Sequence, residues 1–322
     1  MVVALALLTG VSAGSARSRP ARDFYEFGGR IIPADNGSLQ GVHVVATDAR
    51  GSYEALLDSS GVFVGAFPAP PSGRVTLRVF SESADPRYHT SIVTLGGAHR
   101  TLARVVLVPV RWRIRGGAFD GRDVSIDPVQ AAATSSEASG FWRVTKRGQF
   151  AGRAVSWVVD SFPVRVAFRH ERGDPLISVS DSVAFWEIAG QVERLIGRSL
   201  FRPTSFAEID SGADGILVTV NRGMSAAGRT FITYDPTGRI YEALVTVADR
   251  RFLTEPRIAA HELLHAIGLG HTRSWTSVMA PNTGANNVPS VDDVAYAQLY
   301  YAISELQRQR EAPFGILEAV NR

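Results

Sequence analysis

The chain has 322 residues, of which 45% are hydrophobic and 20% are charged, and its formal net charge is +3. This balance is typical of a folded globular protein and excludes a largely disordered or fibrous one. The length exceeds what one hydrophobic core usually serves, so we expect two domains. The arginines are scattered rather than clustered, and no nucleic-acid partner is expected. Cysteine is absent, which excludes disulfides and thiolate metal ligands.

Residues 1–16 pass from an apolar stretch into small residues, the pattern of a secretory signal peptide cleaved after Ala13 or Ala16. We therefore expect a secreted protein, extracellular or periplasmic. No lysine or arginine precedes the apolar stretch, so the true start of the leader is expected upstream. The alternative interpretation of this stretch is a buried N-terminal strand. No later segment approaches about eighteen uninterrupted apolar residues, so we expect no stable membrane insertion.

In residues 23–112, short β-rich runs alternate with turn-forming residues. This pattern is typical of an all-β sandwich. The predicted strands include 41–47, 61–67, 74–80 and 102–108. In this order of strands and turns the region resembles the carboxypeptidase regulatory-like, transthyretin-like β-sandwich. The resemblance implies a structural or recognition module without catalytic residues. We interpret residues 113–160 as a linker that partly packs on the second domain through the aromatic runs at 141–142 and 157–159.

The second domain, residues 161–312, is predicted to be α+β, and residues 313–322 form a C-terminal tail. Strand-like runs occur at 163–168, 215–220 and 239–247. Helical periodicity and capping residues indicate helices at 181–200, 255–267 and 291–310.

Each predicted helix carries a further signal. Thr254 is the expected N-terminal cap of the second helix, with Pro256 in its first turn. The pair Ser290 and Asp293 has capping-box spacing at the start of the third helix. The first helix has apolar residues at helical intervals, namely Val183, Trp186, Ala189, Val192 and Leu195 or Ile196.

Three histidines around a glycine carry the strongest chemical signal. His261 and His265 are four residues apart in a predicted helix, so both imidazoles lie on one face and can reach one metal ion. Glu262 is turned about 100° around the helix axis, which places it near a metal-bound water rather than on the ion. Gly268 can end the helix in a left-handed conformation, so that His271 returns as the third ligand. Three nitrogen ligands that leave one position to water are typical of catalytic zinc; the alternative is three hydrogen-bonded histidines beside a helix end.

The run from His261 to His271 resembles the metzincin signature, His-Glu-x-x-His-x-x-Gly-x-x-His followed by a methionine turn, which residues 277–281 supply. Met279 lies eight residues after His271, a spacing closest to the matrixin branch. The resemblance extends from residue 163 onward and implies a twisted sheet with a zinc-binding helix, preceded by the β-sandwich. It implies that Met279 forms a hydrophobic floor below the zinc without binding it. The chain departs from matrixins at Ala280, where tyrosine is common, and lacks a traceable histidine-bearing loop for a structural zinc.

The resemblance implies a secreted zinc endopeptidase with one catalytic Zn²⁺ and Glu262 as the catalytic base. It also implies that an extended protein or peptide substrate lies along the strand 239–247, taken as the sheet edge. Residues 282–290 are expected to shape the pocket beyond the scissile bond. The substrate-binding residues implied in this way are Ala243, Leu244, Val245 and Pro281.

Other interpretations stay open. Asp210, Asp214 and Asp235 could contact Ca²⁺, although solvated loop acids are commoner. An extracellular binding or adhesion protein would use the β-sandwich, with the zinc site incidental, but the intact Glu262 counts against this. A hydrolase of some other amide would keep the same site residues.

Overall fold

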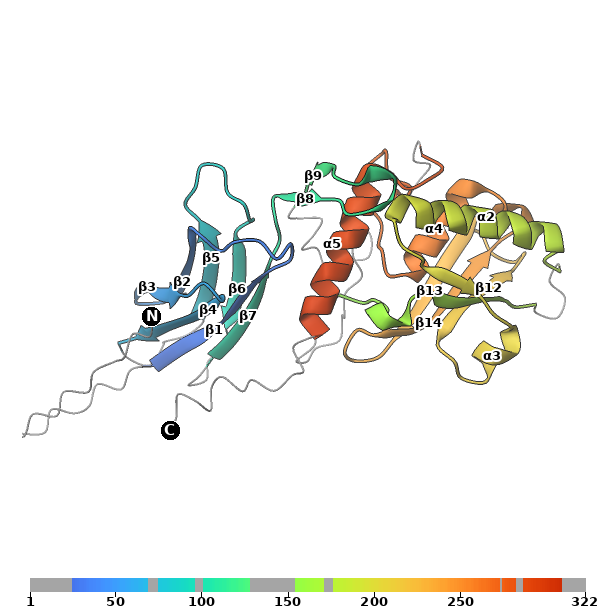
Figure 1. The fold of residues 1–322 in the computed structure, drawn as a ribbon. Coiled ribbons are helices and arrows are strands. Elements are labelled where there is room, and N and C mark those ends of the chain that lie inside the picture. The colour runs from blue at the N-terminus through green and yellow to red at the C-terminus, as the bar shows by residue number, and fades with distance from the viewer. Residues whose placement is uncertain are drawn as a thin grey trace, which may run out of the picture.

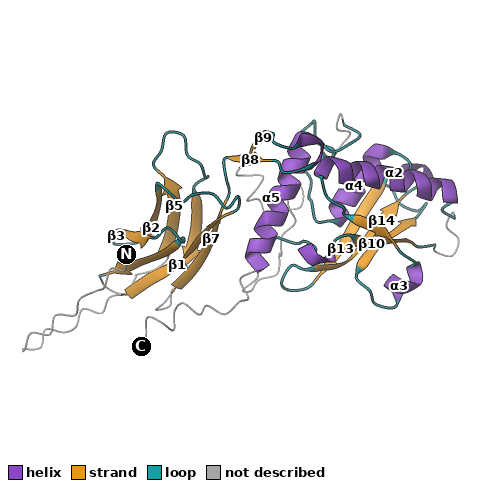
Figure 2. Ribbon diagram, viewed as in Figure 1, coloured by secondary structure: helices purple, strands orange, loops and turns teal. Residues whose placement is uncertain are grey.

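The computed structural model describes residues 25–68, 75–95, 101–127, 154–170, 176–272, 274–281 and 286–308. These residues form an N-terminal part that is mostly β and a C-terminal part with a mixed sheet and helices (Figures 1 and 2). The mixed α and β character is therefore confirmed. Among the helices of the described part, none has both the length and the apolarity needed to cross a membrane. The predicted leader at 1–16 and the tail at 313–322 lie outside the described residues.

The N-terminal part is one seven-stranded sheet in the order β6-β5-β2-β3-β4-β1-β7, which curls until it is nearly a barrel. Neighbouring strands are antiparallel except β1 and β7, which are parallel. Alternate side chains of β2 and β5 enter a core of their own. All four strands predicted here are confirmed within about one residue. The strands are β1 (Tyr25–Pro33), β2 (Val42–Asp48), β3 (Gly51–Leu57), β4 (Val62–Phe67), β5 (Val75–Ser81), β6 (Ser91–Leu95) and β7 (Thr101–Leu107).

A short hairpin follows the N-terminal sheet and packs on the C-terminal part. It consists of β8 (Arg111–Arg113) and β9 (Asp123–Ser125), with the 3-10 turn η1 (Gly117–Phe119) between them. Trp112 and Val124 of the hairpin belong to the same core as the C-terminal helices. Further along, Trp157 is completely buried in that core, just before the 3-10 turn η2 (Val159–Ser161). Of the two runs expected to pack on the second domain, residue 157 lies in this core and 141–142 lies outside the described residues.

The C-terminal sheet has five strands in the order β11-β10-β12-β14-β13. Four of them run parallel, and β13 at the edge is antiparallel to β14. Every residue of β12 is buried, as expected for a strand covered on both faces. The three predicted strands are confirmed, while β11 and β13 are additional. The strands are β10 (Val164–Phe168), β11 (Phe201–Pro203), β12 (Gly215–Val220), β13 (Gly228–Tyr234) and β14 (Ile240–Val247).

The predicted edge position of strand 239–247 is wrong. Ala243, Leu244 and Val245 pair with β12 on one side and with β13 on the other. Because both sides of their backbone are used in the sheet, these residues have no open side to receive a substrate strand. Within the described residues, the edge strand on this side of the sheet is β13, which is absent from the predicted set.

Helices cover both faces of this sheet (Figure 2). The helices α2 (Val179–Ile196) and α4 (Pro256–Ala266) pack on one face, and the short α3 (Phe206–Asp210) packs on the other through Ile209. The last helix, α5 (Val291–Arg308), lies between the two parts of the molecule in Figure 1 and contacts the hairpin of β8 and β9. Gln298 of α5 accepts a hydrogen bond from the Arg115 amide at 3.0 Å.

Two details of the predicted helices need correction. The buried stripe of α2 is Phe185, Ile188, Ala189, Val192 and Ile196, whereas Val183 is 53% exposed. Ala189, Val192 and Ile196 of the predicted stripe are confirmed, whereas Phe185 and Ile188 take the buried places predicted for Val183 and Trp186. Thr254 does not cap α4, because Glu255 occupies that position and the Thr254 hydroxyl instead bonds to Arg251 O in the 3-10 turn η3 (Arg250–Leu253).

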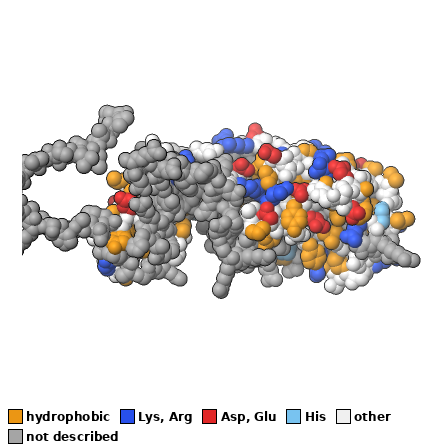
Figure 3. Space-filling view, turned by 90° about the horizontal axis from the view of Figure 1, so that it is seen from below, with side chains coloured by type: hydrophobic (Ala, Val, Ile, Leu, Met, Phe, Trp, Pro, Cys, Tyr) orange, Lys and Arg blue, Asp and Glu red, His pale blue; other side chains and the backbone are white. Residues whose placement is uncertain are grey.

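Other helix signals are confirmed. Pro256 is at the first position of α4. The Ser290 amide donates to Asp293 Oδ2 at 2.8 Å, and the Asp293 amide donates to Ser290 Oγ at 3.2 Å, which completes the capping box of α5. On the face shown in Figure 3, basic, acidic and hydrophobic side chains are interspersed, in keeping with the scattered arginines of the sequence.

Candidate metal centre

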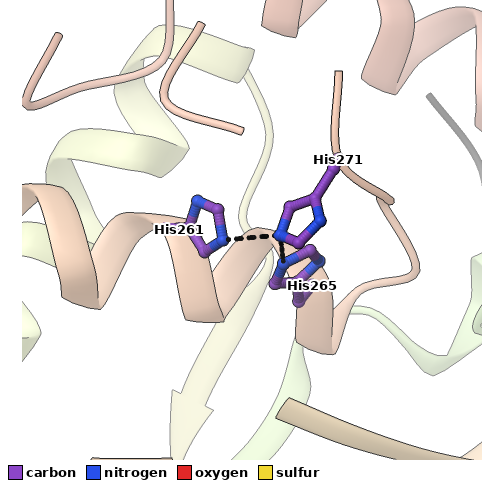
Figure 4. Close-up of side chains that lie close together, drawn as sticks. All are labelled: His261, His265 and His271. Atoms are coloured by element: carbon purple, nitrogen blue, oxygen red, sulfur yellow. Dashed lines mark hydrogen bonds between the residues drawn. The ribbon is translucent and has the colours of Figure 1, made fainter. Parts of the chain in front are cut away.

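The three histidines of the predicted metal site converge. His261 and His265 project from one face of α4, and His271 follows the turn that ends this helix (Figure 4). His271 Nε2 lies 3.1 Å from His265 Nε2 and 3.3 Å from His261 Nε2. Among the described residues, these three form the group of histidines and acids placed to hold a metal ion.

Gly268 makes the return of His271 feasible. Its φ is +103°, a backbone conformation that side chains other than glycine rarely adopt. Space is restricted as well, because a Cβ at this position would lie 2.5 Å from both the Tyr300 hydroxyl and the Val155 carbonyl oxygen. Glycine is therefore needed here both for the turn and for the close approach of neighbouring atoms.

Backbone carbonyls orient two of the rings. His261 Nδ1 lies 2.7 Å from Val278 O, and His265 Nδ1 lies 2.7 Å from Leu269 O. A carbonyl oxygen can only accept, so each Nδ1 carries the hydrogen and each Nε2 keeps a lone pair. These lone pairs belong to the nitrogens that face the cluster, which is the tautomer a metal ligand needs.

The donor set fits a zinc ion. Tetrahedral ligands at about 2.0–2.1 Å from zinc are separated from one another by about 3.3–3.4 Å, close to the spacing of the Nε2 atoms. Burial lowers the pKa of His261 to about 4 and holds the pKa of His265 well below its usual range. Both rings are consequently neutral near pH 7, and neutral imidazole is the form that binds metals.

Glu262 lies on α4 between the two helical histidines and is 5% exposed. Its carboxylate Oε2 accepts a hydrogen bond of 2.6 Å from the Thr230 hydroxyl on β13. Burial raises the pKa of this carboxyl to about 7, against the opposing effects of the Thr230 hydrogen bond and of nearby Arg229. A carboxyl with a pKa in this range can both take up and release a proton near neutral pH.

The predicted methionine turn lies beside the histidines. Met279 is fully buried, and its carbonyl accepts a hydrogen bond from the Thr272 amide at 3.0 Å. The turn is tied to α5 through Asp293, which accepts bonds from the Val278 amide at 3.1 Å and from the Ser277 hydroxyl. Val278 O in turn accepts a hydrogen bond from His261 Nδ1. Through Val278, Asp293 therefore supports the orientation of His261, a candidate metal ligand.

Two of these supporting residues were not predicted. Asp293 was identified only as a helix cap, and nothing in its local spacing indicates contact with the turn. Thr230 lies in the run Gly228–Tyr234, whose threonines and aromatics would have been the signal for a strand.

The predicted substrate-binding residues lie in different parts of the structure. Ala243 and Val245 are buried in the core below the helices, and Leu244 packs toward α3 on the other face. Pro281 is exposed at the end of the methionine turn, and residues 282–285 of the predicted pocket loop lie outside the described residues.

Two of the three predicted calcium ligands make other interactions. Asp214 pairs with the Arg239 guanidinium. Asp235 accepts bonds from the Thr237 amide and hydroxyl at 2.8 and 2.6 Å, which hold its own turn. Asp210 ends α3. These acids form no cluster among the described residues that could hold an ion.

A scan against protein-family models gives no match, and a search of curated proteins also gives none.

Proposed function

We propose that this chain is a zinc-dependent endopeptidase of the metzincin type, closest to the matrixin branch. The observation that carries the proposal is the convergence of three Nε2 atoms, 3.1 and 3.3 Å apart in the two measured pairs, beside a buried glutamate on the same helix. A set of three imidazoles leaves a coordination position for water, which favours a catalytic role over a structural one. The glutamate supplies the base that a purely structural site would not need.

The site residues have separate roles in the proposed hydrolysis. His261, His265 and His271 would hold Zn²⁺, which when bound polarises a peptide carbonyl and lowers the pKa of a water toward about 7. Glu262 takes the proton from the attacking water and later delivers it to the leaving amine. Its pKa of about 7 suits both transfers. Met279 is buried and packs as the hydrophobic floor of the site, without binding the metal.

The substrate is proposed to add as a strand to β13. This strand is the sheet edge next to α4, and its burial alternates between the helix side and the solvent side. Strand addition would pair the amides and carbonyls on the outer side of the edge strand, while alternate substrate side chains reach opposite faces. Peptide recognition along an edge is compatible with an endopeptidase that accepts extended chains.

We further propose that the protein is secreted. We also propose that its N-terminal part, although its sheet curls nearly into a barrel, is related to the carboxypeptidase regulatory-like β-sandwich and serves for recognition or as a tether of the protease. The pattern of residues 1–16 supports secretion. The separate hydrophobic core of the N-terminal sheet supports an independent module.

Metal analysis and a protease assay test this function together. Purified protein is expected to contain one equivalent of zinc and to hydrolyse casein, with activity lost to a chelator and restored by added zinc. Absence of stoichiometric metal after reconstitution would remove the basis of the proposal. Zinc binding without hydrolysis of casein or of a peptide library would instead show that the site does not act on peptide bonds.

A further inference from the structure

The edge strand β13 contacts Glu262 directly. Thr230 is buried, and its hydroxyl lies 2.6 Å from Glu262 Oε2 and 3.2 Å from the main-chain oxygen of the same residue. A hydroxyl has a single hydrogen, and the shorter contact assigns that hydrogen to the carboxylate. A hydrogen bond to a buried carboxylate holds it more firmly than a neutral pair would.

Gly228 lies two residues earlier on the same side of β13. A Cβ at this position would lie 2.5 Å from Glu262 Oε1 and 2.8 Å from Glu262 Cγ. The backbone of Gly228 is not in the positive-φ region, so the need for glycine here is one of space. The absent side chain at 228 and the hydroxyl at 230 together form the wall against which the carboxylate rests.

We propose that Thr230 is a positioning residue for Glu262, and this rests on the proposed function. Its hydroxyl holds Oε2, and the bare backbone of Gly228 leaves room for Oε1, so the two residues fix the orientation in which the carboxylate takes the proton from water and returns it to the leaving amine. Thr230 keeps its own hydrogen throughout. Because Thr230 belongs to the edge strand, pairing of a substrate with β13 and the position of the base are mechanically linked.

Three variants separate this role from a structural one. In Thr230→Val, loss of a hydrogen bond to a charged group should lower kcat about 10- to 100-fold while KM changes little. Thr230→Ser restores the hydroxyl and should recover most of kcat. Thr219→Val is the matched control, since Thr219 is a buried threonine of β12 whose hydroxyl makes no hydrogen bond within the described part of the chain. Its kcat should equal that of the wild type.

Crystal structures of the zinc-loaded proteins give a readout besides activity. Glu262 should leave its position in Thr230→Val and keep it in Thr230→Ser and Thr219→Val. Gly228→Ala should also displace the carboxylate and lower kcat, with zinc content unchanged. An unmoved Glu262 in Thr230→Val, an unchanged kcat, or failure of serine to rescue would overturn the positioning role. Zinc-loaded wild type without peptidase activity would overturn the proposed function, and the crystal structures would still decide the role of Thr230.

Discussion

At the scale of single residues, the site separates metal binding from proton transfer. Glu262→Gln keeps the size of the side chain and an acceptor for Thr230, so zinc content should stay at wild-type level. Loss of the base should lower kcat at least about 100-fold. His265→Ala removes a candidate ligand and should lose both zinc and activity. Elemental analysis and casein hydrolysis check both variants, and full hydrolysis by the glutamine variant would contradict the assignment of the base.

Gly268 offers a second test at this scale because the chain contains a matched glycine. Gly212 has φ +101°, close to the +103° of Gly268, but a Cβ at 212 would meet nothing within 4 Å. Gly212→Ala should therefore show backbone strain alone, with a stability loss of about 1 kcal/mol. Gly268→Ala adds crowding against Tyr300 and Val155, so it should lose more stability and also weaken zinc binding. Urea unfolding and zinc titration measure the two effects; equal zinc affinity in both variants would argue against the role of the glycine turn.

At the scale of elements, the first turn of α5 acts on the metal site from a distance. Asp293 accepts from the Val278 amide, and Val278 O binds His261. Asp293→Ala should therefore weaken zinc affinity by about 10- to 100-fold, the usual cost of losing a residue that supports a metal ligand. Asp292→Ala removes a neighbouring charge from the same turn and should leave the affinity unchanged. If competition titrations with a zinc chelator show equal losses for the two variants, the connection through the turn is refuted.

The capping box of α2 predicts a dependence on pH. Hydrogen bonds from Ser178 hold the pKa of Asp181 below its usual value. A carboxyl with a lowered pKa in the folded state stabilises the fold above its ordinary pKa, and this contribution disappears as pH falls through the lowered value. The free energy of unfolding of Asp181→Ala should fall below that of the wild type at pH 6, and the gap should narrow as pH drops below about 4. Urea titrations at several pH values test this, and a gap that is constant with pH would contradict it.

Local pattern predicted those features whose geometry is decided within a few residues. The convergence of the histidines follows from helix periodicity and one glycine, and both lie between 261 and 271. The order of strands depends on pairing between distant segments, so local pattern predicts neither the interior position of 239–247 nor the edge position of β13. Thr230 reaches Glu262 across 32 positions in the sequence, so no short motif could reveal the contact.

At the scale of the whole molecule, the C-terminal fold begins before residue 161. Trp157 is fully buried, its ring nitrogen donates to Ala266 O at 2.9 Å at the end of α4, and Val155 O lies against Gly268. Arg308 of α5 donates to the carbonyls of Ser156 and Trp157 at 2.7 and 2.9 Å. The segment 154–157 therefore packs beneath the turn that returns His271 to the other histidines.

This packing predicts how the chain tolerates shortening. A chain that begins at residue 161 should lose zinc binding, because the end of α4 and the glycine turn lose their support. A chain that begins at residue 109 keeps the hairpin and Trp157 and should retain zinc stoichiometry. In the full-length protein, Trp157→Ala should cost about 3–5 kcal/mol of stability, whereas Trp157→Phe, which keeps most of the ring, should cost less. Circular dichroism melting and zinc analysis measure these outcomes, and normal zinc binding by the chain from 161 would show that the segment is dispensable.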